Sequence, residues 1–245
     1  MSRNLSLQPP QFAELPATFY SNVNPEPLNR PYWVAFNPSL AEALGLDEDF
    51  QTASNLAYLS GSAEHYRPQP LATVYSGHQF GAYTPRLGDG RALLLGDSED
   101  RHGRRWEWQL KGAGKTPYSR FADGRAVLRS SIREYLCSEA MHGLGIPTTR
   151  ALALCGSQDP VYRERQETAA VLTRIAPSFI RFGHFEYLFY QGREAELKLL
   201  ADFLIRHHYP DCGAAANPYA ELLHQIGLRT ASLAAAWQSV GFCHG

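Results

Sequence analysis

The stretch 104–143 constrains the fold more than any other, because a strand pattern, a glycine-rich loop and a helix pattern follow one another directly. Residues 105–111 alternate between apolar and polar side chains, which predicts a half-buried strand that ends at Lys111. Glycine and proline residues at 112–117 predict a loop that brings backbone close to a ligand. A helix is then expected from about 126 to 142. Its apolar positions are Leu128, Ile132, Tyr135 and Leu136.

Lys111 at the strand end is followed 23 residues later by Glu134, inside the predicted helix. A strand lysine that faces a helix glutamate is the ion pair with which protein-kinase-like folds place nucleotide phosphates. The glutamate fixes the flexible lysine stem and keeps the amine charged. The spacing by itself leaves a plainer interpretation open, in which Lys111 is a solvated strand-end residue and Glu134 an exposed helix residue.

A second glycine-containing segment, 87–91, precedes the apolar run 92–95, which predicts a turn that leads into a strand. Gly88 and Gly90 would let backbone amides approach a phosphate, although such a pair more often marks an ordinary hairpin turn. Arg91 adds a fixed positive charge beside the turn. A glycine loop, a strand and then a strand that ends in lysine is the order found in a kinase-like small lobe.

Two further strands are expected at 151–155 and 169–175, joined by a polar hairpin and followed by Pro177. This order matches the end of a small lobe and its hinge. Arg174 and Arg181 flank the hinge, and a guanidinium fork suits phosphate oxygens. A surface position is nevertheless the commoner role for an arginine.

Acidic residues occur in two predicted turns. The segment 97–103 is interpreted as a charged, solvated hairpin tip. Asp123 and Gly124 lie between the glycine-rich loop and the helix. They either form a plain turn or contact a ligand through their backbone.

The remaining segments predict mostly helices. Residues 194–208 form an amphipathic pattern, and residues 218–240 predict a long helix that would be central to a helical large lobe. A short helix is expected just before Gly45, and residues 1–36 are expected to be extended and to wrap over a neighbouring surface.

Composition narrows the class of protein. The 245 residues carry a net charge of −1, so no basic surplus suggests nucleic acid. No run of about 18 apolar residues occurs, so no membrane partner is expected. Four cysteines without a CxxC motif fit a reducing compartment, and the first 20 residues do not form a secretory signal. A cytoplasmic location is therefore expected.

Three long stretches closely resemble the selenoprotein O family, also called the YdiU family. They are KGAGKTPYSRFADGRAVLRSSIREYLCSEAMHGLGIPTTRAL, VYSGHQFGAYTPRLGDGRALLLGD and TRIAPSFIRFGHFEY. The resemblance runs from about Phe19 to the last residue. It implies an α+β, protein-kinase-like fold, with an antiparallel small lobe, a regulatory-type helix and the first helices of an α-helical large lobe. The implied division is 1–86 for an N-terminal extension, 87–176 for the small lobe and 177–245 for the start of the large lobe.

The resemblance also implies a function, which is transfer of AMP from ATP to hydroxyl side chains of Ser, Thr or Tyr in protein substrates, with Mg²⁺ or Mn²⁺. ATP would bind in a flipped orientation relative to ordinary kinases. Glu134 would position the lysine. The implied nucleotide-binding residues are Gly88, Gly90, Arg91, Lys111, Asp123, Gly124, Arg174 and Arg181. Paired arginines beside the lysine favour nucleotidyl over phosphoryl transfer.

The sequence stops at His244-Gly245, and the resemblance implies that the family's catalytic loop begins with the same His-Gly. Catalytic and metal-binding residues are therefore expected after Gly245 and none within the chain. On this interpretation the chain is truncated, carries only the nucleotide-binding part and is inactive alone. Two alternatives stay open: a non-catalytic nucleotide-binding module, and ordinary kinase-like phosphoryl transfer.

Overall fold

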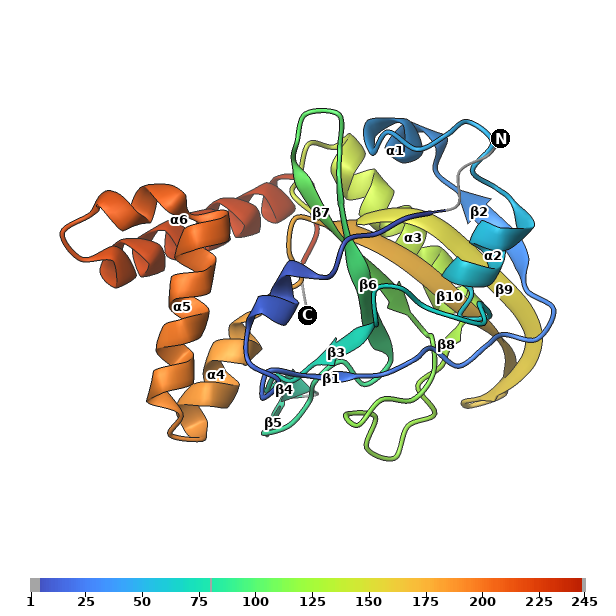
Figure 1. Ribbon diagram of the computed structural model, residues 1–245, viewed down its shortest axis with the longest axis horizontal. Coiled ribbons are helices and arrows are strands. Elements are labelled where there is room, and N and C mark those ends of the chain that lie inside the picture. Colours follow the sequence, from blue (N-terminus) through green and yellow to red (C-terminus); the bar gives the residue numbers. More distant parts are fainter. Residues whose placement is uncertain (1–4, 80, 244–245) are drawn as a thin grey trace.

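An antiparallel sheet built from residues up to 176 lies beside helices built from residues 182–239 (Figure 1). The computed structural model describes residues 5–79 and 81–243. The strand order in the main sheet is β1-β3-β6-β7-β10-β9-β2, with β8 paired to β10, and each described pair is antiparallel. The predicted α+β class is confirmed.

The main-sheet strands are β1 (Tyr20–Asn22), β2 (Tyr32–Phe36), β3 (Leu71–Thr73), β6 (Ala92–Glu99), β7 (Arg105–Lys111), β8 (Ala126–Val127), β9 (Arg150–Tyr162) and β10 (Gln166–Ala176). A separate hairpin consists of β4 (Gly77–Gln79) and β5 (Ala82–Thr84). The α-helices are α1 (Pro38–Ala43), α2 (Ala53–Leu59), α3 (Leu128–Gly143), α4 (Phe182–Tyr190), α5 (Glu194–His208) and α6 (Pro218–Ser239). Two short 3₁₀ helices are η1 (Gln11–Glu14) and η2 (Pro210–Ala214).

Strand β7 lies in the middle of the sheet, between β6 and β10. Trp108 and Leu110 are fully buried in the main hydrophobic core, as the alternating pattern predicts. The prediction of a half-buried strand is wrong, because Glu107 and Gln109 on the other face are buried too. Lys111 pairs in register with Ala92 of β6 and Leu172 of β10. The strand thus places its polar side chains beside residues from two other segments of the chain.

Helix α3 packs on β9 and β10 through Leu128 and Tyr135. The prediction that Ile132 and Leu136 share this buried face is wrong, because their exposed fractions are 37% and 63%. The buried positions of the helix are the small residues Ser131 and Ser138, and the Ser131 hydroxyl donates to the Val127 carbonyl at 3.0 Å. A narrow contact built on a small side chain lets the helix approach the sheet without a wide apolar stripe.

The N-terminal segment runs along both edges of the sheet. Strand β1 pairs with β3 at one edge, and β2 pairs with β9 at the other. Between the sheet and the helices, Phe12 of η1 packs on Phe19 and Phe203. Residues 5–36 therefore wrap the sheet as expected, while the proposed domain divisions after residues 86 and 176 stay predictions.

The acidic segment 97–103 is only partly the solvated tip that the sequence predicts, because Glu99 and residues 101–103 are exposed while Asp97 and Asp100 are buried. Asp97 belongs to β6 and is 1% exposed, and Asp100 is 6% exposed. The Oδ2 atom of Asp97 accepts from the backbone N–H of Gln11 at 2.7 Å and from Arg105 at 3.1 Å. The first of these contacts comes from a segment almost 90 residues earlier, which a local charge pattern cannot reveal.

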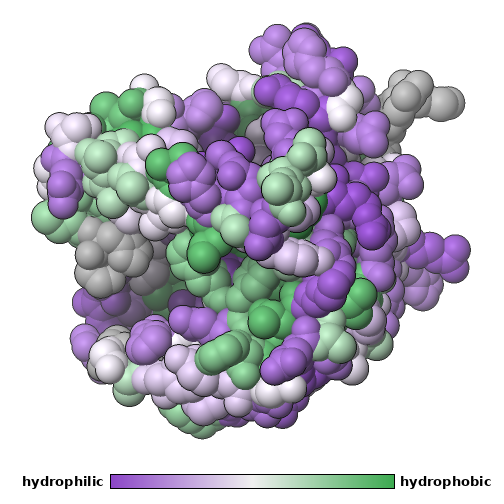
Figure 2. Space-filling view, turned by 90° about the vertical axis from the view of Figure 1, so that its left-hand side faces the viewer, coloured by the Kyte–Doolittle hydropathy of each residue, from purple (hydrophilic) through white to green (hydrophobic). Residues whose placement is uncertain are grey.

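Hydrophobic side chains gather on the helical side of the molecule, as Figure 2 shows. Of the residues of α6, Leu222 is buried, while Leu223 and Leu228 are 74% and 50% exposed.

No helix within residues 5–79 and 81–243 is long and apolar enough to cross a bilayer.

At Gly112, directly after Lys111, the start of the glycine-rich loop lies close to strand β10. It has φ +97°, and a Cβ atom there would lie 2.4 Å from the Ala170 carbonyl oxygen. We expect Gly112→Ala to lower the free energy of unfolding by at least about 2 kcal/mol, because backbone strain and overpacking each cost ~1–3 kcal/mol. Urea unfolding of the purified chain measures this loss.

Gly143→Ala is the matched control. Gly143 ends α3, its backbone is not left-handed, and a Cβ atom added there would meet no other atom within 4 Å. Its replacement should be neutral or stabilising by about 0.5–1 kcal/mol. Equal losses in the two variants would contradict the close approach at Gly112.

Candidate functional site

An ion pair joins the end of β7 to the middle of α3. The Nζ atom of Lys111 donates to Oε2 of Glu134, and both side chains are largely buried. Burial lowers the pKa of Lys111, and Glu134 opposes that effect. Burial acts to raise the pKa of Glu134, but Lys111 and Arg174 outweigh it and hold this pKa below its usual value. The sequence-predicted residues therefore meet, with the carboxyl group in its charged form.

Arg174 of β10 shares the same carboxylate. Its Nη1 atom lies 3.3 Å from Oε1 of Glu134, and its Nη2 atom donates to Oε1 of Gln109. Gln109 is opposite Arg174 in the β7–β10 register. The ring centre of Phe179 lies 5.3 Å from the guanidinium carbon. Each oxygen of Glu134 thus holds one cation, and the arginine is fixed on three sides.

The other two predicted cations, Arg91 and Arg181, lie near this group on two different segments. Arg91 immediately precedes β6, and with Lys111 and Glu134 it lines a cavity of about 450 Å³. Arg181 caps α4, with its guanidinium 5.4 Å from the centre of the Tyr75 ring. Burial lowers the pKa of Arg174, and the positive charge of Arg181 lowers it further. Lys111, Arg174, Arg91 and Arg181 thus place positive charge around the carboxylate of Glu134, with the charge of Asp89 also acting on Arg174.

The glycine turn before β6 is shaped by contacts within the protein. A Cβ atom on Gly88 would lie 2.5 Å from the Tyr118 ring, and one on Gly90 would lie 2.9 Å from the Tyr118 carbonyl oxygen. The N–H groups of Gly88 and Gly90 donate to the carbonyls of Tyr75 and Gly88 at 2.9 and 3.0 Å. Close packing of the loop that carries Tyr118 explains both glycines. Their predicted contact with a nucleotide stays a prediction.

Asp89, between these glycines, is a residue that sequence reasoning missed. Its Oδ2 atom accepts from the backbone N–H and the hydroxyl of Thr73 at 3.0 and 2.6 Å. Its Oδ1 atom accepts from the Tyr75 hydroxyl at 3.3 Å. An aspartate between two glycines is a usual turn-shaping signal, and this carboxylate holds the glycine turn against β3.

Asp123 and Gly124 do not line the cavity that Lys111 and Glu134 share, and Asp123 reaches it only through Arg163. Asp123 accepts two hydrogen bonds from Arg163, at 2.7 and 2.9 Å, and Arg163 lines the same cavity as Lys111. Gly124 leaves no room for a side chain, because a Cβ atom would lie 2.1 Å from the Gly114 carbonyl group. Both residues close the glycine-rich loop, and their contact with a ligand stays a prediction.

The chain matches known proteins along almost its whole length. Residues 3–245 match the sequence profile of the family described as "Protein adenylyltransferase SelO". The chain belongs to the SelO family. Three relatives named "Protein nucleotidyltransferase YdiU" come from Variovorax paradoxus, Thiobacillus denitrificans and Aliivibrio salmonicida. They are 56%, 54% and 55% identical over 242, 235 and 238 residues.

These alignments cover 96% of this chain and 48–49% of each relative. The chain thus spans about half the length of the curated SelO-family relatives it matches. The predicted catalytic-loop start, His244-Gly245, lies outside the described residues. Within residues 5–79 and 81–243, no group of three or more His, Cys, Asp or Glu side chains is arranged to hold a metal ion.

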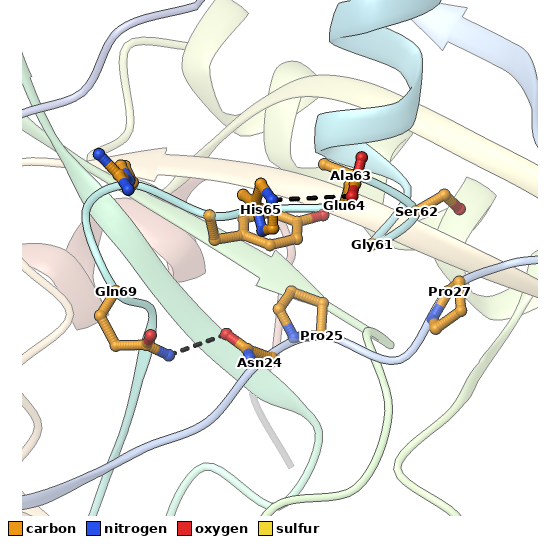
Figure 3. Close-up of a pocket in the computed structure, with 11 residues that line it drawn as sticks. Asn24, Pro25, Pro27, Gly61, Ser62, Ala63, Glu64, His65 and Gln69 are labelled. Atoms are coloured by element: carbon orange, nitrogen blue, oxygen red, sulfur yellow. Dashed lines mark hydrogen bonds and ion pairs between the residues drawn. The ribbon is translucent and has the colours of Figure 1, made fainter.

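A second cavity, of about 340 Å³, lies away from this site in the SelO-family chain (Figure 3). It is lined by the segment 24–27 and the loop 61–69. Gln69 donates to Asn24 across it at 2.9 Å. Because none of the predicted site residues lines it, this cavity is not part of the candidate site.

Glu107 connects the site's central strand to the helices. It is 3% exposed, and its Oε2 atom accepts from the backbone N–H of Phe179 at 2.6 Å. It stands opposite Asp97 in the β6–β7 register. Burial and the charge of Asp97 raise its pKa to about 8, with Asp89 adding to the rise, while the Phe179 N–H and Arg105 oppose it. Glu107 therefore holds the segment between Arg174 and Arg181 mainly as a neutral acid.

The raised pKa of Glu107 makes stability pH-dependent. The carboxyl group ionises at about pH 4.3 when unfolded and near pH 8 when folded, so its favourable contribution is complete below about pH 4.3. That contribution is lost as the pH rises to 8, at up to about 1.4 kcal/mol per pH unit. Glu107→Gln keeps the acceptor and removes the titration. We expect the variant to gain stability relative to the unaltered chain as the pH rises from 5 to 8.

Urea unfolding at several pH values between 5 and 9 measures this difference. Above pH 8 the difference should level off. Parallel pH profiles for the two proteins would show that Glu107 does not titrate in this range.

Proposed function

We propose that the chain is the ATP-binding part of a protein adenylyltransferase, which transfers AMP from ATP to hydroxyl side chains of a protein substrate. The observation that carries this proposal is the shared carboxylate of Glu134, with Lys111 on one oxygen and Arg174 on the other. Arg91 and Arg181 add positive charge nearby. Such a cluster suits a polyanion, and the names of the relatives point to nucleotide transfer onto protein.

The order of the structural parts supports a kinase-like small lobe. A glycine turn precedes β6, a lysine ends β7, and its glutamate partner lies on the next helix, α3. Protein kinases place a glycine-rich loop, a strand lysine and a helix glutamate in the same order. In this proposal the strands 92–176 with α3 form that lobe, and α4–α6 begin a helical lobe.

Two arginines beside the lysine favour AMP transfer over phosphoryl transfer. When a hydroxyl oxygen attacks the α-phosphorus, the bond from that phosphorus to the bridging oxygen breaks and pyrophosphate leaves. The hydroxyl proton passes to a base, which this proposal assigns to the part of the relatives that the chain does not span. In the proposed flipped orientation, Arg174 and Arg181 lie against the β- and γ-phosphates and stabilise the charge that develops on pyrophosphate. Lys111, held by Glu134, binds a phosphate oxygen. Gly88, Gly90, Asp123 and Gly124 would lie against the rest of the nucleotide.

We propose Mg²⁺ or Mn²⁺ as a cofactor only for a protein as long as the relatives, and not for the residues described here. Among the described residues, Glu134 is engaged by two cations, Asp89 by Thr73 and Tyr75, and Glu167 by Arg129. Glu164 also lines the cavity, but no group of three or more His, Cys, Asp or Glu side chains among the described residues is arranged to hold a metal ion, so no step is assigned to one.

Replacing the two arginines tests the nucleotide site. We expect Arg174→Ala and Arg181→Ala each to weaken ATP binding by about 1.5–3 kcal/mol, because each removes a charge-assisted contact. Arg101→Ala is the matched control, since Arg101 donates to the Glu42 carbonyl at 2.7 Å on the exposed hairpin. Isothermal calorimetry with ATP measures the three affinities, and equal values would mean that the two arginines are not nucleotide ligands.

Labelled ATP tests the chemistry. The chain is joined to the second half of the Variovorax paradoxus relative and incubated with an acceptor protein and ATP labelled at the α- or the γ-phosphate. We expect the α-label to reach the acceptor and the γ-label not to, because AMP carries only the α-phosphate. Lys111→Ala should remove most of the transfer while leaving the chain folded, since a strand-end lysine is not part of the apolar core.

The outcomes of that experiment separate the alternatives. Transfer of the γ-label would show phosphoryl transfer. ATP binding without transfer of either label would indicate a binding module. Full transfer by Lys111→Ala would contradict the role assigned to the lysine.

A further inference from the structure

His184 is a buried imidazole that the proposed reaction does not use. It is 1% exposed and occupies the first turn of α4, three residues after Arg181. Burial lowers its pKa to about 3, so the ring is neutral at physiological pH. Its Nε2 atom has no hydrogen-bond partner among the described residues.

The neutral ring holds the backbone of Arg181. The Nδ1 atom lies 2.9 Å from the Arg181 N–H and 3.3 Å from the Arg181 carbonyl oxygen. Because a backbone N–H can only donate, the shorter contact makes Nδ1 an acceptor and places the ring proton on Nε2. The ring thus receives the N–H that precedes the first turn of α4, as the acceptor of a capping box does.

The His184 ring also packs against Tyr75, and the Arg181 side chain lies over the same tyrosine ring. The His184 and Tyr75 ring centres are 5.1 Å apart, and the Arg181 guanidinium lies 5.4 Å from the Tyr75 ring centre. Tyr75 also accepts the N–H groups of Leu87 and Gly88 through its carbonyl, at 2.8 and 2.9 Å. Arg181 and the glycine turn therefore rest on one tyrosine, and His184 packs against its ring.

The start of α4 packs tightly against the segment that contains Tyr75 and Ser76. The N–H of Ser76 donates to the Gly183 carbonyl at 2.9 Å, and a Cβ atom on Gly183 would lie 1.9 Å from the Ser76 carbonyl oxygen. On its other side the His184 ring lies 5.6 Å from Phe12. The start of α4 is thus fixed against the segment that leads into the glycine turn.

A purely structural role does not explain a histidine at this position. A leucine would fill a similar space between Phe12 and Tyr75 without burying an N–H that lacks a partner among the described residues. What a leucine lacks is the acceptor for the Arg181 N–H. We propose that His184 is a positioning residue for nucleotide binding. It fixes the backbone of Arg181 and, by packing on Tyr75, sets the position of the Arg181 guanidinium relative to the glycine turn. This inference rests on the proposed role of Arg181 as an ATP ligand.

The test is a thermodynamic cycle between His184 and Arg181 in the 245-residue chain. The variants are His184→Leu, His184→Asn, Arg181→Ala and the double variant with leucine and alanine. Asn can present its Oδ1 atom near the position of Nδ1, so it is the conservative replacement. Calorimetry with ATP and with inorganic triphosphate gives the affinities, and urea unfolding gives the stabilities.

We expect His184→Leu to weaken ATP and triphosphate binding about tenfold or more, and His184→Asn to stay within about threefold of the unaltered chain. In the Arg181→Ala background, His184→Leu should change neither affinity by more than about twofold, since its effect acts through Arg181. Any change in stability should be the same in both backgrounds. If the effects of the His184 and Arg181 variants on ATP affinity depend on each other while their effects on stability do not, His184 acts by positioning Arg181.

Equal weakening by His184→Leu with and without Arg181 would overturn the inference while leaving the proposed ATP site intact. So would an unaltered affinity for His184→Leu when Arg181→Ala binds ATP weakly. If Arg181→Ala binds ATP as well as the unaltered chain does, the proposed role of Arg181 fails and the inference fails with it.

If His184→Leu does not fold, the pair Tyr75→Phe and Tyr75→Leu gives the same cycle. Phenylalanine keeps the ring beneath the guanidinium and leucine removes it. We expect Tyr75→Leu to weaken ATP binding in the unaltered chain but not in the Arg181→Ala background, because only leucine removes the ring that the guanidinium packs on. Tyr75→Phe should weaken binding in neither background. An equal effect of Tyr75→Leu in the two backgrounds would overturn the inference.

Discussion

The carboxylate of Glu134 is the contact on which the rest of the site depends. Lys111 comes from β7, Arg174 from β10 and Glu134 from α3, so one carboxylate joins a helix to two neighbouring strands. Removing it would leave two largely buried cations facing each other without a counter-charge. Further along α3, Glu139 accepts from Arg150 at 2.7 Å. Charged contacts at Glu134 and Glu139 thus add to the packing of Leu128 and Tyr135 in holding the helix on the sheet.

Strand β7 sets the spacing of the site. Side chains that alternate along a strand recur on one face about every 7 Å. On the polar face of β7, Glu107 accepts from the Phe179 N–H, Gln109 accepts from Arg174, and Lys111 pairs with Glu134. One strand thereby holds the segment before α4, an arginine and the helix glutamate in a row. Gln109 acts here as a neutral partner that holds a buried arginine without adding negative charge to the site.

The parts that sequence predicts well are those that depend on local order. The strand ending at Lys111, the loop after it and the helix carrying Glu134 follow from periodicity and glycine placement. What the sequence does not reveal are contacts between distant segments. Arg174 reaches Glu134 across 40 residues, and Asp97 binds Gln11 across 86, so a charge pattern that looks solvated is buried. The outward-facing apolar positions of α3 are missed for the same reason, because a period defines a face but not what covers it.

In the proposed site, the glycine turn and the arginines would contribute unequally to binding an anion. In loops that cradle phosphate through their backbone, free N–H groups point at the ligand. Here the N–H groups of Gly88 and Gly90 are already bound to protein carbonyls, so the turn in this form has no free amide to offer from either glycine. In the proposed nucleotide site, recognition of phosphate would therefore fall to charged side chains, whose positions must be fixed by other residues. The buried polar groups around Arg174 and Arg181 meet that requirement, because the orientation of each guanidinium is set by the side chains packed against it.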